Sequence, residues 1–467
     1  MNIKTDFKKV PLNYQMIANE LSLIVAGHKF PRLSQVGAGW TIETNGPRIS
    51  RLWQPQEQYF IKQTKTERNS FYLLDFLLGD SDKKFRLIEA NGSNAALSSA
   101  CSGVDTMRSQ HIYRTVTERG IGDGNGVLLF AFQKNFLHIA EFHLRVAAVC
   151  DLLSADGYNV RFANASENIE PNDEIDCIAD NIENICNHID ARNGKLYYRG
   201  KVVIFATNGN ILPEFIRHDK LYLNDGEYYC KLDNTKLDLS FFHEGKGVLL
   251  THDRQKQQDI VKQLNNPNFL PIDYVSFFSY DDLMRNFKTR IKKDTKYIIK
   301  MNAGSGGAGM AIVDGNSNIK DIYQDMLKKL KEKYGADVEK SIFPFVAFEF
   351  VESTRYSMKD GGHRWDLRVE CLVSHKSVTI KPCVLRICQA PVDNCDMYRW
   401  ESTIANLTGR IDPQNSLRYM RYPFNKRKSD DSITVLDSIQ INDALLDALI
   451  NFCASYCEVA EQEYYSD

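Results

Sequence analysis

Residues 71–94, FYLLDFLLGDSDKKFRLIEANGSN, predict a β-hairpin, because two apolar runs flank the polar turn GDSDKK. If the turn centres near Asp82, Asp75 and Glu89 lie opposite one another, with Cβ atoms about 4.5–5.5 Å apart. Glu89 and Asn91 are two residues apart and share a face of their strand. The three side chains then converge at one end of the hairpin, with oxygen ligands of the kind that Mg²⁺ takes. The alternative is a solvated hairpin edge with scattered acids.

The composition is typical of a globular protein with several domains. The 467 residues exceed one ordinary core, and the formal net charge of −2 gives no reason to expect a nucleic-acid or membrane partner. An apolar signal-peptide core and a run of 18 apolar residues are both lacking, so we expect a cytoplasmic protein. The eleven cysteines are dispersed, which is typical of reduced thiols. Cys453 and Cys457 are expected to be buried on a closing helix rather than to bind metal.

The order of apolar patterns divides the chain into three parts. Strand-like runs alternate with an amphipathic stretch that ends at Gly157, which predicts a parallel sheet within residues 123–248. The part before it, 1–122, holds a helical and irregular start and then the hairpin. The part after it, 249–467, reads as mixed helices and strands.

A glycine-rich loop follows a strand in YIIKMNAGSGGAGMAIV. Lys300 ends the strand, and the small residues of the loop allow backbone N–H groups to approach phosphates. A strand follows the loop, so it is neither a Walker A loop nor a Rossmann turn. A tight hairpin turn remains the alternative. The loop residues expected at the phosphates are Gly304, Ser305, Gly306 and Gly307.

The segment VAFEFVES is a candidate adenine-binding hinge. Glu349 could accept from the exocyclic amine, the backbone of Phe350 and Val351 could contact the ring edge, and Glu352 could reach the ribose. An ordinary exposed position on a strand is the alternative for Glu349.

Four charged or amide residues follow in order. Asp366 and Arg368 lie two apart in WDLRV, Arg386 lies in the next strand, and Asn406 lies in STIANLTGR. The alternative for Arg368 is a buried structural pair with Asp366.

Taken in order, the motifs of residues 249–410 resemble the ATP-grasp superfamily of carboxylate–amine ligases. The family's Asp-Lys helix corresponds here to Asp253-Arg254, with Lys256 two residues on, so the phosphate-binding residue is open between Arg254 and Lys256. The family's metal-binding strands usually come after the Asn segment. Here LLDFLL and LIEANGSN precede the motifs of residues 249–410, an order that resembles the circularly permuted eukaryotic-type glutathione synthetase. The glycine-rich loop NAGSGGAG lacks the metal-binding Glu of that enzyme.

The resemblance implies an α/β fold with α+β lobes. An ATP-grasp nucleotide domain would be completed by the N-terminal hairpin, with a Rossmann-like domain between them. It implies ATP and two Mg²⁺ ions as cofactors and an amide or peptide bond formed through an acyl phosphate. The substrates would be a small carboxylate and an amine, from an amino acid, a peptide or a protein side chain, and a homodimer is possible. A kinase or a non-catalytic ATP-binding protein on the same fold is the alternative.

The resemblance also implies residue roles. Asp75, Glu89 and Asn91 would bind metal, and Lys300 with Arg254 or Lys256 would hold the α- and β-phosphates. Arg386, Asn406 and Arg368 would stabilise the transferred phosphoryl group. The acid substrate would contact Arg68, Ser93, Asn94 and Ser98.

Overall fold

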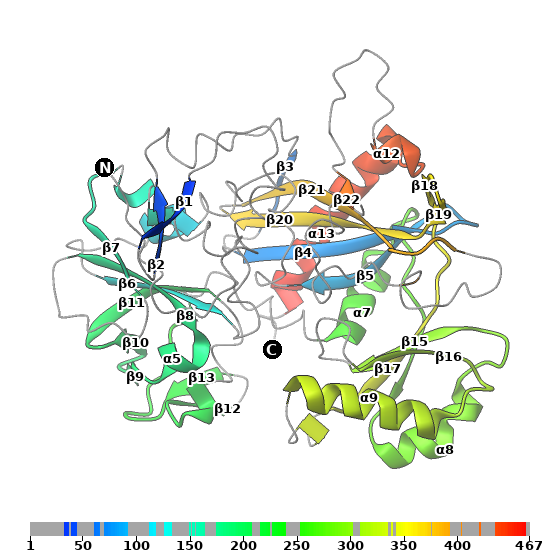
Figure 1. Cartoon of the computed structure of the whole chain (residues 1–467), viewed down its shortest axis with the longest axis horizontal. Coiled ribbons are helices and arrows are strands. Elements are labelled where there is room, and N and C mark those ends of the chain that lie inside the picture. The colour runs from blue at the N-terminus through cyan, green and yellow to red at the C-terminus, as the bar shows by residue number, and fades with distance from the viewer. Residues whose placement is uncertain are drawn as a thin grey trace.

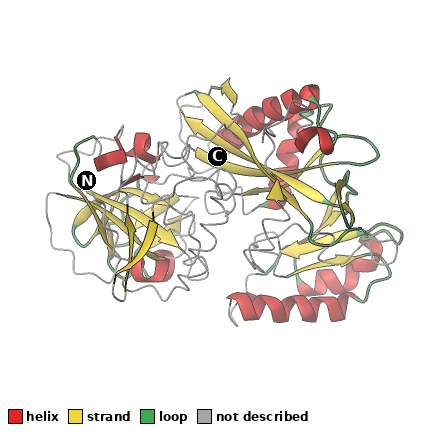
Figure 2. Ribbon diagram, turned by 45° about the horizontal axis from the view of Figure 1, so that its top comes forward, coloured by secondary structure: helices red, strands yellow, loops and turns green. Residues whose placement is uncertain are grey.

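The computed structural model describes part of the chain. The described residues are 32–36, 39–43, 60–65, 70–91, 112–117, 126–132, 149–150, 152–154, 156–163, 174–207, 215–224, 227–239, 253–301, 309–334, 338–339, 342–374, 376–392, 403, 420–421 and 435–463. They form a mixed α/β structure with several sheets (Figures 1 and 2).

One sheet contains the parallel strands expected between residues 123 and 248. Its order is β7-β8-β6-β11-β10-β9, with β6, β7, β8 and β11 parallel and β9 and β10 added by antiparallel hairpins. The bounds are β6 Gly126–Phe132, β7 Val160–Ala163, β8 Ile175–Asn181, α5 Ile182–Cys186, β9 Ile189–Arg192, β10 Lys195–Tyr198 and β11 Lys201–Thr207. Apolar side chains of β6, β8, α5 and β11 form its core.

A smaller antiparallel sheet, ordered β14-β17-β15-β16, has helices on one face. Its elements are β14 Tyr274–Phe277, α8 Tyr280–Arg290, β15 Tyr297–Met301, β16 Met310–Val313, α9 Ile319–Tyr334 and β17 Phe345–Glu349. Alternate residues of these strands pack on α8 and α9, which leaves the opposite set for the other face. Helix α8 was not predicted from the sequence, although Ser279 caps it and Leu283 and Phe287 repeat at helical spacing.

The third main sheet joins distant parts of the chain. Its order is β22-β21-β20-β4-β5, and β3 also pairs with β21. The strands are β3 Phe60–Gln63, β4 Ser70–Leu78, β5 Phe85–Asn91, β20 Trp365–Ser374, β21 Ser377–Ile387 and β22 Met420–Arg421. The expected hairpin of residues 71–94 is confirmed as β4 and β5, and β4 pairs antiparallel with β20 (Figure 1).

One face of this third sheet is an apolar core. Helices α7 Arg254–Leu264 and α13 Asp443–Glu463 pack on it, and Phe76 contacts the rings of Phe85, Phe269 and Phe452. Cys453 and Cys457 are fully buried in this core, as expected.

Shorter elements complete the described chain. They are β1 Arg32–Val36, β2 Gly39–Glu43, β12 Leu221–Asn224, β13 Glu227–Cys230, β18 Tyr356–Met358, β19 Gly361–His363 and α12 Val435–Ser438. Within the described residues, no helix has the length and apolar character to cross a membrane. The cysteines whose side chains the structure describes are buried free thiols: Cys150, Cys177, Cys186, Cys230, Cys371, Cys388, Cys453 and Cys457.

Candidate active site

The second face of the third sheet carries charged side chains. Asp75 lies directly opposite Glu89 across the hairpin, as the turn position predicted, and opposite Arg368 across the β4–β20 pair. Leu74 and Phe76, the neighbours of Asp75, point into the apolar core. Since side chains alternate along a strand, Asp75 belongs to the other face.

Asp75 is the centre of a buried ion network. Arg368 donates to both of its carboxylate oxygens, from Nε to Oδ1 and from Nη2 to Oδ2, each at 2.7 Å. Nη2 of Arg386 donates to Oδ2 at 2.9 Å, and Nδ2 of Asn91 lies 3.4 Å from the same oxygen. One fully buried carboxylate therefore holds two guanidinium groups from neighbouring strands.

Asp366 extends this network on the side of Arg386, whose Nε donates to Oδ1 of Asp366 at 2.5 Å. Burial raises the pKa of Asp366 to about 6, and nearby Arg386 only partly offsets that effect. Desolvation works against the charge of Arg386, but the adjacent Asp366 and Asp75 outweigh it and raise its pKa. Arg368 is thus held in a network with Asp75, where the sequence alternative had a simple pair with Asp366.

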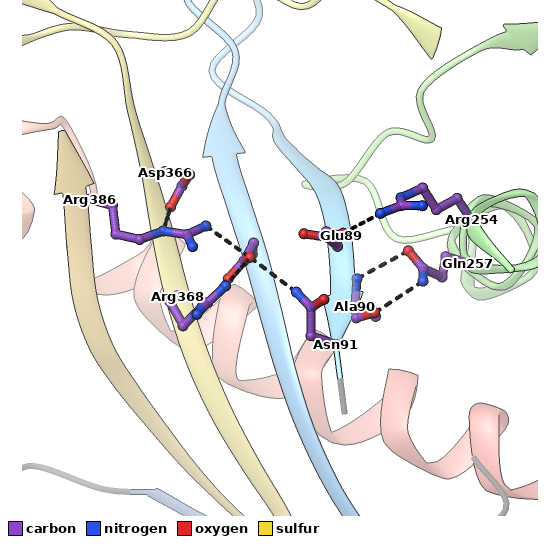
Figure 3. Close-up of polar contacts among 9 residues, drawn as sticks. Glu89, Ala90, Asn91, Arg254, Gln257, Asp366, Arg368 and Arg386 are labelled. Atoms are coloured by element: carbon purple, nitrogen blue, oxygen red, sulfur yellow. Dashed lines mark hydrogen bonds and ion pairs between the residues drawn. The ribbon is translucent and has the colours of Figure 1, made fainter. Parts of the chain in front are cut away.

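Glu89 binds a different cation, Arg254, at the start of α7. Nη2 of Arg254 donates to Oε1 of Glu89 at 2.6 Å, and Nη1 donates to the carbonyl of Met301 at 3.0 Å (Figure 3). Asp253 caps the helix and accepts from the backbone N–H of Lys256, so the helix begins with Arg254 facing the site. Of the two basic residues left open by the sequence, Arg254 lies in the charged cluster.

Lys300 joins the cluster electrostatically from the end of β15. Desolvation and the nearby Arg254 lower its pKa to about 7, although Glu89 and Asp75 favour its charged form. Burial opposes the ionisation of Glu89, yet Arg254 and Lys300 outweigh it and lower its pKa to about 2. At neutral pH Glu89 is therefore an anion, and Lys300 is divided between its two protonation states.

Two adjacent glutamines of α7 form hydrogen bonds with the backbone of β5, the edge strand of the third sheet. Gln257 accepts from the N–H of Ala90 and donates to its carbonyl, both at 3.1 Å (Figure 3). Gln258 donates to the carbonyl of Leu87 at 2.8 Å and accepts from the N–H of Ile272. Ala90, which lies between Glu89 and Asn91, is thereby fixed to the helix that carries Arg254. This role was not predicted from the sequence, where the signal is two adjacent glutamines close to the apolar Ile260 and Val261 on an expected helix.

A buried apolar cluster lies next to Lys300 on the small sheet. Val346 and Phe348 project from the face opposite α8 and α9 and pack with Ile272, Ile88, Tyr274 and Val351. The Nζ atom of Lys300 lies 5.0 Å from the centre of the Phe348 ring. This buried apolar cluster thus borders the charged cluster.

The proposed hinge beyond Phe348 is partly engaged within the fold. The N–H of Phe350 donates to the carbonyl of Lys296 at 2.8 Å, and the contact of the Phe350 and Val351 backbone with a ring edge stays a prediction. Arg364 donates to Glu352 from Nε at 3.1 Å and from Nη2 at 2.6 Å. Oε2 of Glu349 lies 3.8 Å from Nζ of Lys292, and the Glu349 side chain is half-buried. This pairing of Glu352 competes with the expected ribose contact.

The remaining predicted site residues lie outside the described part of the chain. They are Arg68, Ser93, Asn94, Ser98, Gly304, Ser305, Gly306, Gly307 and Asn406.

The expected metal ligands differ in how well they suit a cation. Glu89 keeps 29% of its side chain exposed and pairs with Arg254, so it and the neighbouring Asn91 offer oxygens to a hard ion. Asp75 is fully buried, and guanidinium donors occupy both of its oxygens. The described residues contain no cluster of three or more His, Cys, Asp or Glu side chains suited to metal. Metal binding therefore fits Glu89 and Asn91, and it remains a prediction.

Comparisons with known proteins give distant structural likenesses. No family model and no curated sequence matches the chain. A structure titled a putative gamma-glutamylcysteine synthetase from Methylobacillus flagellatus KT is 12% identical, with a TM-score of 0.45 over 99% of both chains. A glutathione synthetase-like effector (GSS30) from Globodera pallida is 13% identical, with a TM-score of 0.34 over 69% of this chain and 74% of its own. With both TM-scores below 0.5, neither likeness decides the fold or the reaction.

Proposed function

We propose that this chain is an ATP-dependent carboxylate–amine ligase of the ATP-grasp type, with its metal-binding hairpin at the N-terminal end. One observation carries the proposal. The β4–β5 hairpin pairs with β20, far along the chain, and brings Asp75 and Glu89 against Arg368, Arg386 and Arg254. The circular permutation and a glutathione synthetase-like reaction are parts of this proposal.

The charge of the cluster favours an anionic ligand. The cations Arg254, Lys300, Arg368 and Arg386 face the carboxylates Asp75, Glu89 and Asp366. With Lys300 protonated, the cluster has one more positive than negative charge, and its low exposure strengthens electrostatic attraction. Phosphate and carboxylate groups are the ligands that guanidinium forks bind best.

The proposed nucleotide position follows from the charged cluster and the neighbouring hinge. Lys300 and Arg254 would hold the α- and β-phosphates, and the adenine ring would lie beside residues 349–352. Phosphoryl transfer asks mainly for positioning and charge neutralisation, and fixed side chains provide both. Glu89 and Asn91 would hold Mg²⁺, which when bound neutralises phosphate charge.

In the proposed reaction, a carboxylate oxygen attacks the γ-phosphorus of ATP, and ADP leaves. The amine then attacks the acyl carbon, phosphate leaves, and the amine loses a proton as the amide forms. Arg368 and Arg386 would neutralise the charge that develops on the transferred group, as preorganised donors do. These steps need no protein nucleophile.

The decisive experiment measures ADP release from ATP and Mg²⁺ with a panel of amino acids and dipeptides, with product masses read in parallel. We expect condensation products from the wild-type protein, and no substrate-dependent ADP release from Glu89→Ala with its fold retained. The matched control is Asp80→Ala, which removes an exposed acid from the turn of the same hairpin and should keep activity.

Two outcomes would contradict the proposal. Phosphorylated products without condensation would indicate a kinase. An active Glu89→Ala variant would remove the basis for the assignment of the site.

A further inference from the structure

We infer that Asp75 is a positioning residue that fixes Arg368 and Arg386 as an anion-binding pair, and not a ligand of the metal ion. This inference rests on the proposed function and divides the three expected metal ligands into two groups. Glu89 and Asn91 belong to the metal side, and Asp75 belongs to the side of the transferred phosphoryl group.

Guanidinium donors occupy both lone pairs of Oδ2 of Asp75 and one lone pair of Oδ1. Its Oδ2 atom accepts from Arg368 at 2.7 Å and from Arg386 at 2.9 Å, and Asn91 lies 3.4 Å away. Its Oδ1 atom accepts from Nε of Arg368 at 2.7 Å. Each carboxylate oxygen has two lone pairs, so Oδ2 is saturated. A direct Mg²⁺ ligand would need to lie about 2.0–2.1 Å from the ion, amid two cationic groups that repel it.

Glu89 provides the contrast on the neighbouring strand. Its side chain is partly exposed, and the described ion pair that it makes is with Arg254. Both acids lie on one face and directly opposite one another, so the difference arises from their partners. Glu89 faces the helix and the small sheet, whereas Asp75 faces the arginines of β20 and β21.

The network also fixes the orientation of both guanidinium groups. Arg368 is gripped through two parallel hydrogen bonds, and Arg386 is held between Asp75 and Asp366. A planar guanidinium held along one edge loses little further freedom when it binds an anion. Asp75 would therefore act on phosphate through the arginines that it orients.

The test separates metal binding from phosphate binding in one protein. Mn²⁺ affinity for the protein–ADP complex is measured by electron paramagnetic resonance, and inorganic phosphate is then titrated into the Mn²⁺–ADP complex by calorimetry. We expect Asp75→Asn to keep Mn²⁺ affinity within about twofold and to weaken phosphate binding at least about tenfold. Glu89→Gln, the matched control, should lose Mn²⁺ affinity by at least about tenfold.

Arg368→Lys keeps the charge but removes the fork, and it adds a coupling readout. If Asp75 acts through Arg368, the double variant Asp75→Asn with Arg368→Lys should lose no more phosphate affinity than the worse single variant. A role of Asp75 in packing alone would leave phosphate affinity unchanged in the folded protein, and that result would overturn the inference. Equal losses of Mn²⁺ affinity in Asp75→Asn and Glu89→Gln would also overturn it.

A failure of Asp75→Asn to fold and a failure of the wild-type protein to bind Mn²⁺–ADP have different meanings. If Asp75→Asn does not fold, Arg368→Lys and Arg386→Lys decide: weakened phosphate binding with intact Mn²⁺ affinity supports the inference, and weakened Mn²⁺ affinity overturns it. If the wild-type protein binds no Mn²⁺–ADP, the proposed function itself fails, and this result is distinct from every outcome above.

Discussion

The two faces of the β20–β4–β5 sheet differ in almost every respect, although the same strands build both. Leu74 and Phe76 lie in an apolar core against α7 and α13, and Asp75 between them anchors buried arginines on the other face. Burial of apolar area is the main favourable term in folding, whereas a buried ion network is weak evidence for stability. The apolar face therefore accounts for the fold, and the charged face carries the residues of the proposed chemistry.

Replacement of the whole charged network would test this division most severely. The variant carries Asp75→Leu, Arg368→Met, Arg386→Met and Asp366→Leu. Because apolar replacement of a complete buried ion network is often neutral or favourable, we expect the free energy of unfolding to stay unchanged or to rise by about 1–4 kcal/mol. Loss of the charge-stabilising groups should lower ADP release by about 10³-fold or more. Urea unfolding and a coupled ADP assay provide the two readouts.

The single variant Arg368→Met is the control for the quadruple change, because it leaves Asp75 with fewer cations. It should be less stable than both the wild-type and the quadruple variant. A quadruple variant that unfolds more readily than Arg368→Met would contradict this division between the two faces, since the charged face would then support the fold.

The apolar face should respond in the opposite way. Phe76→Ala removes a fully buried ring that contacts three other rings and should lower the free energy of unfolding by about 3–5 kcal/mol. The affinity of the folded protein for ADP should not change, because the ring points away from the charged cluster. Urea unfolding and calorimetric ADP titration check the two expectations.

The matched control for Phe76 is Ile61→Ala on β3 of the same sheet, where 59% of the side chain is exposed. It should change stability by no more than about 0.5 kcal/mol. A loss of ADP affinity in folded Phe76→Ala would show that the two faces are not independent.

The charge of Lys300 gives the charged face a pH dependence that the apolar face lacks. Its pKa of about 7 means that the free protein holds it mostly neutral above pH 7, and bound phosphates favour the protonated form. Metal-free ADP should therefore bind at pH 8 with proton uptake, and its affinity should fall by up to about tenfold per pH unit above 7. Calorimetry in two buffers of different ionisation enthalpy measures the proton count.

Lys300→Met should abolish this proton uptake. Binding by the wild-type protein with no proton uptake at pH 8 would show that Lys300 is already charged or lies apart from the phosphates.

The hairpin and the position of its acids were predictable from sequence, because turn residues and apolar alternation are local signals. The partners were not. Arg368 lies 293 positions from Asp75, and Arg254 lies 165 positions from Glu89, so only the sheet order brings them together. Spacing alone suggested an Asp366–Arg368 pair, whereas in the structure Asp366 binds Arg386, which lies opposite it on the neighbouring strand.

The hinge shows a different limit. Residues 349–352 follow a strand as expected, but strand spacing does not reveal that Arg364 pairs with Glu352 or that Lys296 accepts from Phe350. These are tertiary contacts whose geometry depends on the packing of β17 against its neighbours.

The pairing of β4 with β20 also has a consequence for synthesis. The hairpin leaves the ribosome long before its partner strand, and at about 5–20 residues per second the intervening chain takes roughly 15–60 s. During that wait Leu74 and Phe76 have no α13 to cover them, and the edge of β4 is unpaired, which is a template for wrong strand pairing. A nascent chain stalled before residue 365 should therefore bind chaperones through this hairpin and release them once β20 emerges.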